Sequence, residues 1–374
     1  MKIGVVKAYL LKEIIDLVRS RMIFMVYIMP SMILLLFGYG IKMEVTHART
    51  IILDNDNSHF SRMLIDKFTH SKYFDAKVSH MSEDEALHEI KKAKADILII
   101  VPPSFEKRLL HFQKSEIGVF VDAAFPTRGY TMESYAKGVI LDTVLSVAKE
   151  KGIDYTKSLI FVNNRNLFNQ AMRDEDAIVP GLLGLVLLVA PAILAALLIV
   201  KEKEKGTIFN FYSSAVSKIE FITAKLLPAF FLHSLNIFIL LLIALYIFNV
   251  PFRGSFYLYW FSSEIYILIS LGIGTLVSVI TKRQIVAVVL TIIITIIPGF
   301  LYSGILMPIS SMRGESYIEA HIFPVMYFNH IIYDTFLIGE GLSSFKNVLY
   351  LCILLFYAFV LLVLGTLFLK KEFK

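Results

Sequence analysis

The chemically most distinctive residues of the chain lie in a polar segment, 201–225, between two long apolar runs. The segment opens with lysine and glutamate in alternation over 201–205, and such a run can lie in water or among lipid headgroups but not in hydrocarbon. Gly206 allows a turn, and Thr207 can cap a helix that starts directly after it. These residues suit binding rather than catalysis.

The short helix expected after Thr207 has an apolar side. Ile208, Phe211 and Tyr212 follow the i, i+3, i+4 spacing that places side chains on one helix face. A loop between two membrane spans has no core of its own in which to bury this face. We therefore expect the face either to lie on the bilayer surface or to fill a groove on a cytoplasmic partner protein.

The elements that hold this segment in place are predicted membrane spans. The chain of 374 residues is 56% hydrophobic and only 18% charged, and its mean hydropathy of +0.68 lies outside the range of ordinary soluble domains. Six runs contain roughly the 20 apolar residues that a helix needs to cross a bilayer. They cover residues 22–40, 178–200, 226–250, 257–280, 284–303 and 348–369.

The distribution of basic residues predicts the orientation of these spans. Lys and Arg of the short connections concentrate on one side, in residues 1–21, 201–225, 281–283 and 370–374. The short connections on the other side hold only Arg253, Arg313 and Lys346. Because cytoplasmic loops carry the excess of Lys and Arg, we expect both termini to be cytoplasmic. The net charge of +6 then suits anionic lipid headgroups and does not indicate nucleic-acid binding.

Residues 41–177 are too many for a loop, and they alternate between strand and helix patterns. Aliphatic or β-branched runs bounded by turn residues predict strands at 50–53, 73–78, 96–101 and 117–121. Helical spacing lies between them, and Ser82 followed three residues later by Glu85 is a capping box. We expect a small α/β domain, which would fold without disulfides because the only cysteine, Cys352, falls in the last apolar run.

Three polar residues inside the apolar runs are candidates for a substrate path or for polar packing. His233 and Asn236 are three residues apart and would face the same side of one helix. Burying them without partners costs about 1–3 kcal/mol per group, so they should face protein or a water-filled path. Glu264 lies near the start of its run beside Trp260, which favours pairing at the membrane rim over a proton relay.

The sequence carries no recognisable catalytic motif. Residues 54–57 offer four oxygen side chains, but His59 and Ile65 stand where an EF-hand needs Gly and Glu, so a turn with Ser58 capping the next helix is simpler. No G-x-x-x-x-G-K-[ST], G-x-S-x-G or H-E-x-x-H sequence occurs. We expect no metal, no cofactor and no enzymatic activity, so transport against a gradient would need free energy from a partner.

Several of these residues resemble those of a known family. Glu202, Glu204, Gly206 and Thr207, with Ser-Ala-Val-Ser over 214–217 and Lys-Leu-Leu-Pro over 225–228, resemble the loop after the second span of type-two ATP-binding-cassette (ABC) exporter permeases. In that family the loop forms a coupling helix that docks on a separate ATPase subunit. The Asp-Asn-Asp-Asn-Ser run at 54–58 and the apolar stretch 304–346 resemble the external domain and the re-entrant segment of the subfamily with one large domain after its first span.

The resemblance implies an α-helical polytopic membrane protein with six transmembrane helices and an inserted extracytoplasmic α/β domain. The parts would be a cytoplasmic interfacial helix 1–21, a first span 22–40, the external domain 41–177, a five-helix transmembrane domain 178–369 with coupling loop 201–225 and external re-entrant segment 304–346, and a cytoplasmic tail 370–374. The coupling residues would be Glu202, Glu204, Gly206, Thr207, Ile208, Phe211, Tyr212, Ser214 and Ser217. The partners would be an ABC ATPase subunit, a second copy of the permease or a related permease, a periplasmic adaptor protein where one is used, and the lipids of a bacterial cytoplasmic membrane.

Two other hypotheses stay open on the sequence. The spans could merely anchor an external domain that binds a ligand or recruits partners, and then no ATPase would copurify. The chain could instead be a secondary transporter driven by an ion gradient. That function needs intramembrane carboxylates near the midplane and repeated halves, for which Glu264 alone is little support.

Overall fold

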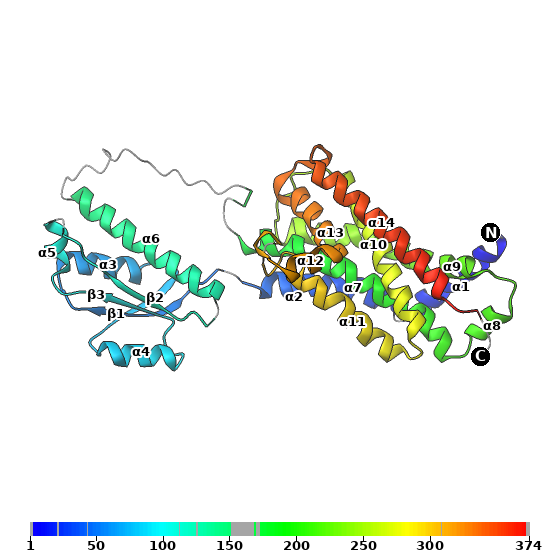
Figure 1. Cartoon of the computed structure of the whole chain (residues 1–374), viewed down its shortest axis with the longest axis horizontal. Coiled ribbons are helices and arrows are strands. Elements are labelled where there is room, and N and C mark those ends of the chain that lie inside the picture. The colour runs from blue at the N-terminus through cyan, green and yellow to red at the C-terminus, as the bar shows by residue number, and fades with distance from the viewer. Residues whose placement is uncertain are drawn as a thin grey trace. The chain divides into compact units, whose positions relative to one another are not determined.

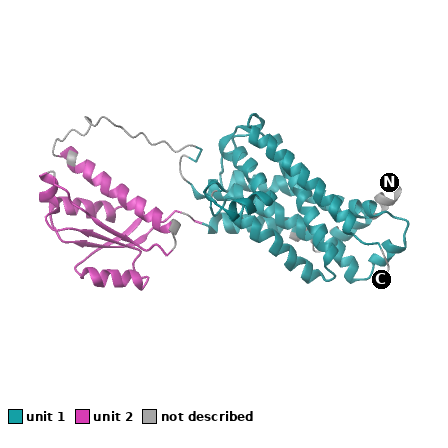
Figure 2. Ribbon diagram, in the orientation of Figure 1, with its two compact units in different colours: residues 1–41, 165–374 teal, residues 42–164 magenta. Residues whose placement is uncertain are grey.

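The computed structural model describes residues 3–20, 22–42, 44–111, 113–124, 126–150, 168–169, 173–307 and 309–371. The chain forms two compact units, which are coloured separately in Figure 2. The helical unit comprises residues 1–41 and 165–374, and the α/β unit comprises residues 42–164. Each unit has its own core and is described by itself.

The α/β unit contains a four-stranded sheet with helices on both of its faces (Figure 1). Its strands are β1 (Ala48–Asp54), β2 (Phe74–Ser79), β3 (Ile97–Val101) and β4 (Gly118–Val121), and its helices are α3 (His59–Thr69), α4 (Glu83–Lys91), α5 (Phe105–Leu110) and α6 (Pro126–Glu150). The sheet order is β2-β1-β3-β4, in which only the pair β3 and β4 is antiparallel. All four strands lie where the alternating pattern of the sequence predicted them.

The two faces of the sheet bury different residues because successive side chains of a strand point to opposite sides. Ile52 and Ile99 face the larger core, which α3 and α6 cover. Leu53 and Leu98 face a smaller cluster under α4. The predicted capping box at Ser82 is confirmed: its hydroxyl accepts from the Glu85 N–H, while the Glu85 carboxylate accepts from the Ser82 N–H.

The helical unit begins with α1 and α2 and continues after the α/β segment. Its α-helices are α1 (Ile3–Arg19), α2 (Met22–Gly40), α7 (Asp174–Glu204), α8 (Ile208–Ser213), α9 (Lys218–Leu242), α10 (Phe256–Ile280), α11 (Gln284–Leu301), α12 (Glu315–Ile322), α13 (Pro324–Tyr333) and α14 (Phe345–Phe368). Short π or 3-10 turns follow at η2 (Ile243–Ile247), η3 (Ile309–Ser311), η4 (Asp334–Ile338) and η5 (Gly341–Ser343). In this unit α8 lies at the end where α1 begins and α14 ends (Figure 1).

Five helices of the described chain are long and apolar enough to cross a membrane. They are α7, α9 with η2, α10, α11 and α14. The first predicted span corresponds to α2, which has the predicted bounds Met22–Gly40. The side chains of α2 are described only over Val26–Gly40, so its length as an apolar span is not tested and the count of six stays a prediction. α7 begins four residues before the predicted span, at Asp174, because three acidic residues in its first turn suit the positive end of the helix dipole.

α7 is the central helix of this unit, and it packs against α2, α9, α10, α11 and α13. Gly181 and Gly184 on α7 could serve a dimer interface or internal packing on the sequence alone. The structure places them against α13: a Cβ at Gly184 would lie 1.8 Å from Asn329 Oδ1. Asn329 Nδ2 donates to the carbonyls of Gly181 and Ser303 at 3.3 and 2.9 Å. Within this chain, the two glycines therefore admit the α13 segment to the surface of α7.

The apolar stretch predicted at 304–346 folds as α12, α13 and short turns, and most of α13 is buried. Four of the predicted parts lie partly outside the described residues. The positions concerned are 1, 2 and 21 of the interfacial helix, 43, 112, 125, 151–167 and 170–172 of the external domain, 308 of the re-entrant segment and 372–374 of the tail.

Candidate functional site

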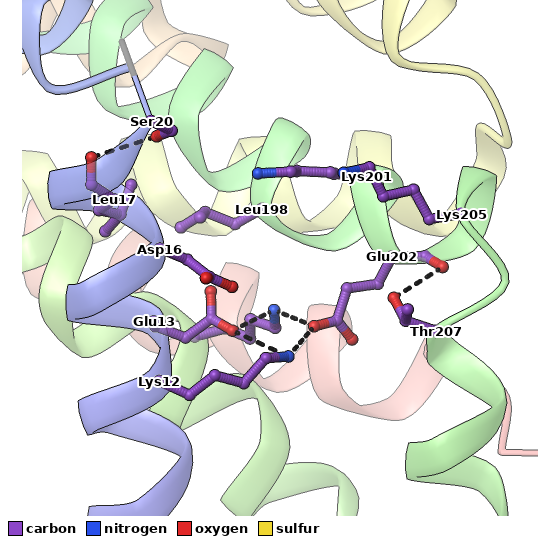
Figure 3. A pocket seen from close by; sticks show the side chains of 11 residues that line it. Lys12, Glu13, Asp16, Leu17, Ser20, Leu198, Lys201, Glu202, Lys205 and Thr207 are labelled. Atoms are coloured by element: carbon purple, nitrogen blue, oxygen red, sulfur yellow. Dashed lines mark hydrogen bonds and ion pairs between the residues drawn. The ribbon is translucent and has the colours of Figure 1, made fainter.

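Three consecutive residues at the end of α7 contact four other helices. The first of them, Glu202, accepts through Oε1 from Lys225 Nζ of α9 at 2.5 Å and from Lys12 Nζ of α1 at 2.9 Å. Lys225 Nζ also donates to Glu13 Oε1 of α1 at 2.6 Å. α1, α7 and α9 are thus joined by one network of alternating charge, which Figure 3 shows from close by.

Three members of this network, Glu13, Glu202 and Lys225, are buried although they are ionisable, whereas Lys12 is exposed. Lys225 and Glu13 are each 2% exposed, and Glu202 is 8% exposed. A lysine in such surroundings is stable only with carboxylate partners, since desolvation of an unpaired charge costs several kcal/mol. Burial lowers the pKa of Lys12, but its hydrogen bond and attraction to Glu202 outweigh that effect and raise the pKa above its ordinary value. Lys12 therefore stays charged at neutral pH.

A polar cavity of about 220 Å³ lies beside the network. Its walls come from α1, from the end of α7 and from α9, and Asp16, Ser20 and Lys201 contribute to them (Figure 3). The lining holds charges of both signs. Charged side chains therefore face one another across this cavity between α1, α7 and α9.

The next two residues of α7 complete helix ends elsewhere in the unit. Lys203 Nζ donates to the carbonyls of Ser278, Val279 and Thr281 at the end of α10. Glu204 Oε2 accepts from the backbone N–H and the side-chain amide of Gln284 at the start of α11, at 3.1 and 2.7 Å. Carbonyls at a helix C-terminus and N–H groups at a helix N-terminus lack partners in their own helix. The positive Lys203 therefore suits the carbonyls that end α10, and the negative Glu204 suits the N–H group that begins α11.

The turn between α7 and α8 follows the prediction at Gly206 and departs from it at Thr207. Gly206 has φ +74°, a conformation that glycine adopts without strain. Thr207 stands at the N-cap position of α8 but makes no capping bond. Its hydroxyl donates instead to the carbonyl of Glu202 at 3.4 Å. The predicted cap is therefore wrong, because the hydroxyl completes the last turn of α7.

The sequence pattern predicts that the apolar face of α8 lies on the bilayer surface or in a groove of a partner protein, whereas the structure buries most of it within the chain. Ile208 and Phe211 are 3% and 1% exposed, and Tyr212 is half-buried. The Phe211 ring stacks on Phe221 of α9, with centroids 4.1 Å apart. Lys371, beyond α14, lies 5.0 Å from the centre of the Phe211 ring. The chain itself supplies the core that the sequence pattern could not show.

Lys371 also holds the end of α8. Its Nζ donates to the carbonyls of Ser214 and Val216 at 2.7 and 2.6 Å. Ser214 is half-buried, and Ser217 begins α9 through a capping box with Glu220. The predicted coupling residues therefore lie together around α8, but several of them support the helix from inside.

The outward side of α8 consists of other residues. Phe209 is 51% exposed, and Asn210, Ser213 and Ala215 are exposed beside it. A half-exposed phenylalanine on a six-residue helix fixed from behind is suited to contact with a second protein. The sequence pattern assigned this role to the opposite side of the helix.

The three intramembrane candidates pack within the helical unit. His233 and Asn236 are both fully buried, and Asn236 Nδ2 donates to the Val26 carbonyl of α2 at 3.3 Å. Neither ring nitrogen of His233 has a hydrogen-bond partner within the described part of the chain. Glu264 accepts from Ser234 Oγ at 2.6 Å and from Trp260 Nε1 at 2.8 Å. These two contacts agree with the pairing of Glu264 that the sequence favoured over a proton relay.

Residues 54–57 form the turn that the sequence suggested. Asp54 Oδ1 accepts from the N–H groups of Asp56 and Asn57, and Ser58 caps α3. Among the residues that the structure describes, no group of three or more His, Cys, Asp or Glu side chains could hold a metal ion.

Sequence reasoning missed Glu13, Lys225 and Lys371 as members of this site. Glu13 falls within the predicted interfacial helix 1–21, where nothing in the sequence indicated that it is buried. Lys225 carried one usable signal, since it lies eight positions into α9 directly before an apolar run. Lys371 carried none, because its role depends on where α14 ends in space.

Comparison with known proteins places the chain beside transport proteins. Residues 20–367 match a family model described as ABC-2 family transporter protein. The chain is 28% identical over 337 residues to the probable multidrug ABC transporter permease YbhS of Escherichia coli, covering 90% of this chain and 89% of that protein. It is 25% identical over 340 residues to the probable multidrug ABC transporter permease YbhR of E. coli, covering 91% of each. ABC transporter G family member 20 of Dictyostelium discoideum is 20% identical over 340 residues, covering 88% of this chain and 46% of that protein.

Proposed function

Because the chain belongs to the ABC-2 transporter family, we propose that it is the permease subunit of an exporter whose ATP hydrolysis takes place on a separate ATPase subunit. The observation that carries the proposal is α8. Its outward side is exposed, and the end of α7 that leads into it is tied by Glu202, Lys203 and Glu204 to α1, α9, α10 and α11. A displacement of α8 by a partner would therefore move several candidate spans together.

The proposed arrangement in the membrane has six spans, with α2 as the first. Both termini and α8 face the cytoplasm, and residues 41–177 lie outside, in a bacterial cytoplasmic membrane. The basic residues in the short connections support this orientation, and the E. coli relatives support a bacterial membrane as its place. Two permeases, either two copies or two related chains, would form the path between them, because six spans are few for a complete path.

The transported substrate is proposed from the relatives alone. Both E. coli relatives are named as probable multidrug permeases, so we propose that this chain also exports small drug-like molecules. A periplasmic adaptor would extend the path where the outer membrane has to be crossed. His233 and Asn236 would act as packing residues rather than line the path, since both are fully buried against other helices.

The proposal is tested by changing the outward side of α8 without changing its core. Phe209→Asp places a charge on the exposed side, and Phe209→Leu is the matched apolar control. We expect the epitope-tagged full chain to copurify an ABC ATPase from its host membrane, with the Asp variant retaining at least tenfold less. Export of ethidium from cells should fall in parallel, because a charge in the centre of such an interface costs more than 1.4 kcal/mol.

Two results would contradict this function. If no ATPase copurifies with the unaltered chain, the anchored binding protein becomes the better interpretation. If Phe209→Asp keeps both the ATPase and export, α8 is not the docking element. The thermal unfolding temperature of each variant serves as the control for folding.

A further inference from the structure

An apolar groove of about 530 Å³ runs between α9, α10 and α14, and none of the four residues of the charged network lines it. Ile222, Leu226 and Phe230 of α9 form one wall, and Phe359 and Val363 of α14 form the other. Leu271 of α10 lies on the floor and is fully buried. Thr223 and Thr366 are the only polar side chains in its lining.

The groove exists because α14 packs closely on α10 and leaves α9 at a distance. Gly272 of α10 meets α14 so tightly that a Cβ there would lie 2.8 Å from Leu361 Cβ. A Cβ on Gly365 of α14 would likewise lie 2.9 Å from Thr275 Cγ2. Close approach at these two glycines fixes α14 against α10. Within the described part of the chain, no side chain fills the space that remains between α9 and α14.

The length of the groove indicates the size of its occupant. Along α9 the lining runs from Ile219 to Phe230, which is about 16 Å at a rise of 1.5 Å per residue. That distance is about half of a hydrocarbon core of roughly 30 Å. A helix from another protein would run across the whole core, whereas an acyl chain of one leaflet ends at its middle.

Basic residues stand at the open end of the groove. Ile219 and Thr366 lie at the end of the helical unit that carries α8, and Lys218 precedes Ile219. Lys370 lies four residues after Thr366, just beyond the end of α14 at Phe368, and is exposed. Both positions can reach the headgroup layer, because long side chains at helix ends extend toward water. A negatively charged headgroup is therefore complemented where the acyl chain leaves the groove.

We propose that this groove binds one acyl chain of an anionic phospholipid from the leaflet on the side of α8, with the lipid phosphate between Lys218 and Lys370. The lipid would cover the apolar surface between α9 and α14, beginning at the first turn of α9. This site is separate from the outward side of α8 and does not depend on an ATPase partner. Loss of lipid binding can therefore be told apart from loss of ATPase binding and export.

The test uses the purified full chain in detergent with dioleoylphosphatidylglycerol, dioleoylphosphatidylcholine and a phosphatidylglycerol carrying a diazirine in one acyl chain. Native mass spectrometry measures lipid retention, and peptide mapping locates the crosslinks. We expect crosslinks to concentrate on the lining of α9, α10 and α14. Thr223→Trp, which fills the groove, should lower them severalfold, whereas Leu235→Trp on an exposed part of the same helix should not.

A second set of variants tests the two lysines, and it remains informative if the tryptophan variant fails to fold. Lys218→Gln and Lys370→Gln together should abolish the preference for phosphatidylglycerol over phosphatidylcholine, each lysine contributing about fivefold, or roughly 1 kcal/mol. Lys346→Gln, at the opposite end of α14, should leave the preference unchanged. Equal retention of both lipids by the unaltered chain would overturn the proposal. So would crosslinks spread evenly over α11, or a groove that crosslinks only to a second copy of the chain.

Discussion

Lys225 shows how strongly one side chain can constrain three helices. It lies in a nearly fully buried position and donates to Glu13 of α1 and Glu202 of α7. The two carboxylates balance the desolvation of the ammonium group, but only while both remain in place. Removing the Lys225 charge leaves two buried carboxylates, which only the exposed Lys12 can balance.

We therefore expect Lys225→Met to destabilise the helical unit by about 3–5 kcal/mol, the usual cost of breaking a buried ion pair. The measurement is thermal unfolding of the purified full chain in detergent. Lys205→Gln, an exposed lysine on the same cavity, is the control and should change little. The triple variant that also carries Glu13→Gln and Glu202→Gln should regain part of the loss; an unfolding temperature for Lys225→Met equal to that of the unaltered chain would contradict the argument.

Asp96 plays a comparable part in the α/β unit. Its two carboxylate oxygens accept from Arg49 Nη2 at 2.8 Å and Nε at 2.9 Å, and Arg128 Nη2 lies 3.3 Å away. The hydrogen bond from Arg49 lowers the pKa of Asp96, against the opposing effect of burial. Because the folded-state pKa lies below the ordinary value, ionised Asp96 stabilises the fold above about pH 4, and this stabilisation is lost as the pH falls through the folded-state pKa.

We expect Asp96→Asn to reduce hydrogen-exchange protection of β1 and β3 at pH 6, and the difference from the unaltered chain to shrink as the pH falls below about 4. Rates are corrected for the pH dependence of intrinsic exchange. Asp75→Asn, at an exposed carboxylate of β2, is the control. A difference that stays constant from pH 6 to pH 3 would show that the Asp96 charge is not responsible.

α8 is too short to be stable by itself, since an isolated six-residue helix does not repay the cost of nucleation. Its order comes from contacts at its back: Phe221 stacks on Phe211, and Lys371 binds the carbonyls that follow the helix. α8 is thus held in place by Phe221 of α9 and by Lys371. Its outward side can present Phe209 without contributing to the core.

The pair α7 and α13 illustrates close packing between two elements. We expect Gly184→Ala to destabilise the helical unit by about 1–3 kcal/mol, because its Cβ would overlap Asn329. Thermal unfolding is the measurement, and Gly138→Ala on α6, where nothing lies within 4 Å of the added Cβ, is the control. Combining Gly184→Ala with Asn329→Ala should cost less than the sum of the two changes. Additive costs would show that the two residues do not conflict.

The arrangement of the whole molecule in the membrane is tested by labelling from each side. After Cys352→Ser removes the only cysteine, Glu83→Cys reports on the α/β unit and Ser213→Cys reports on α8; both positions are exposed. A membrane-impermeant maleimide added to intact spheroplasts should label Glu83→Cys at once and Ser213→Cys only after lysis. The reverse order would invert the proposed orientation, and equal labelling before lysis would place both positions on one side.

The sequence by itself determined the features that depend on neighbours along the chain. The apolar runs predicted the long helices because each span requires its own length of hydrocarbon-compatible residues. The four strands and the caps at Ser58 and Ser82 were predictable for the same reason, since alternation and capping act within a few residues. The pattern at 201–213 likewise predicted a short helix near its observed position.

Only the tertiary structure decided which side of α8 is free and which charges are buried. Glu13 and Lys225 are 212 residues apart, and Lys371 reaches carbonyls 157 and 155 residues away. An apolar face next to a lysine has the same local pattern whether another part of the chain covers it or a partner does. What covers the face depends on how distant helices pack. The same packing decides the role of Gly181 and Gly184, which contact the α13 segment within this chain.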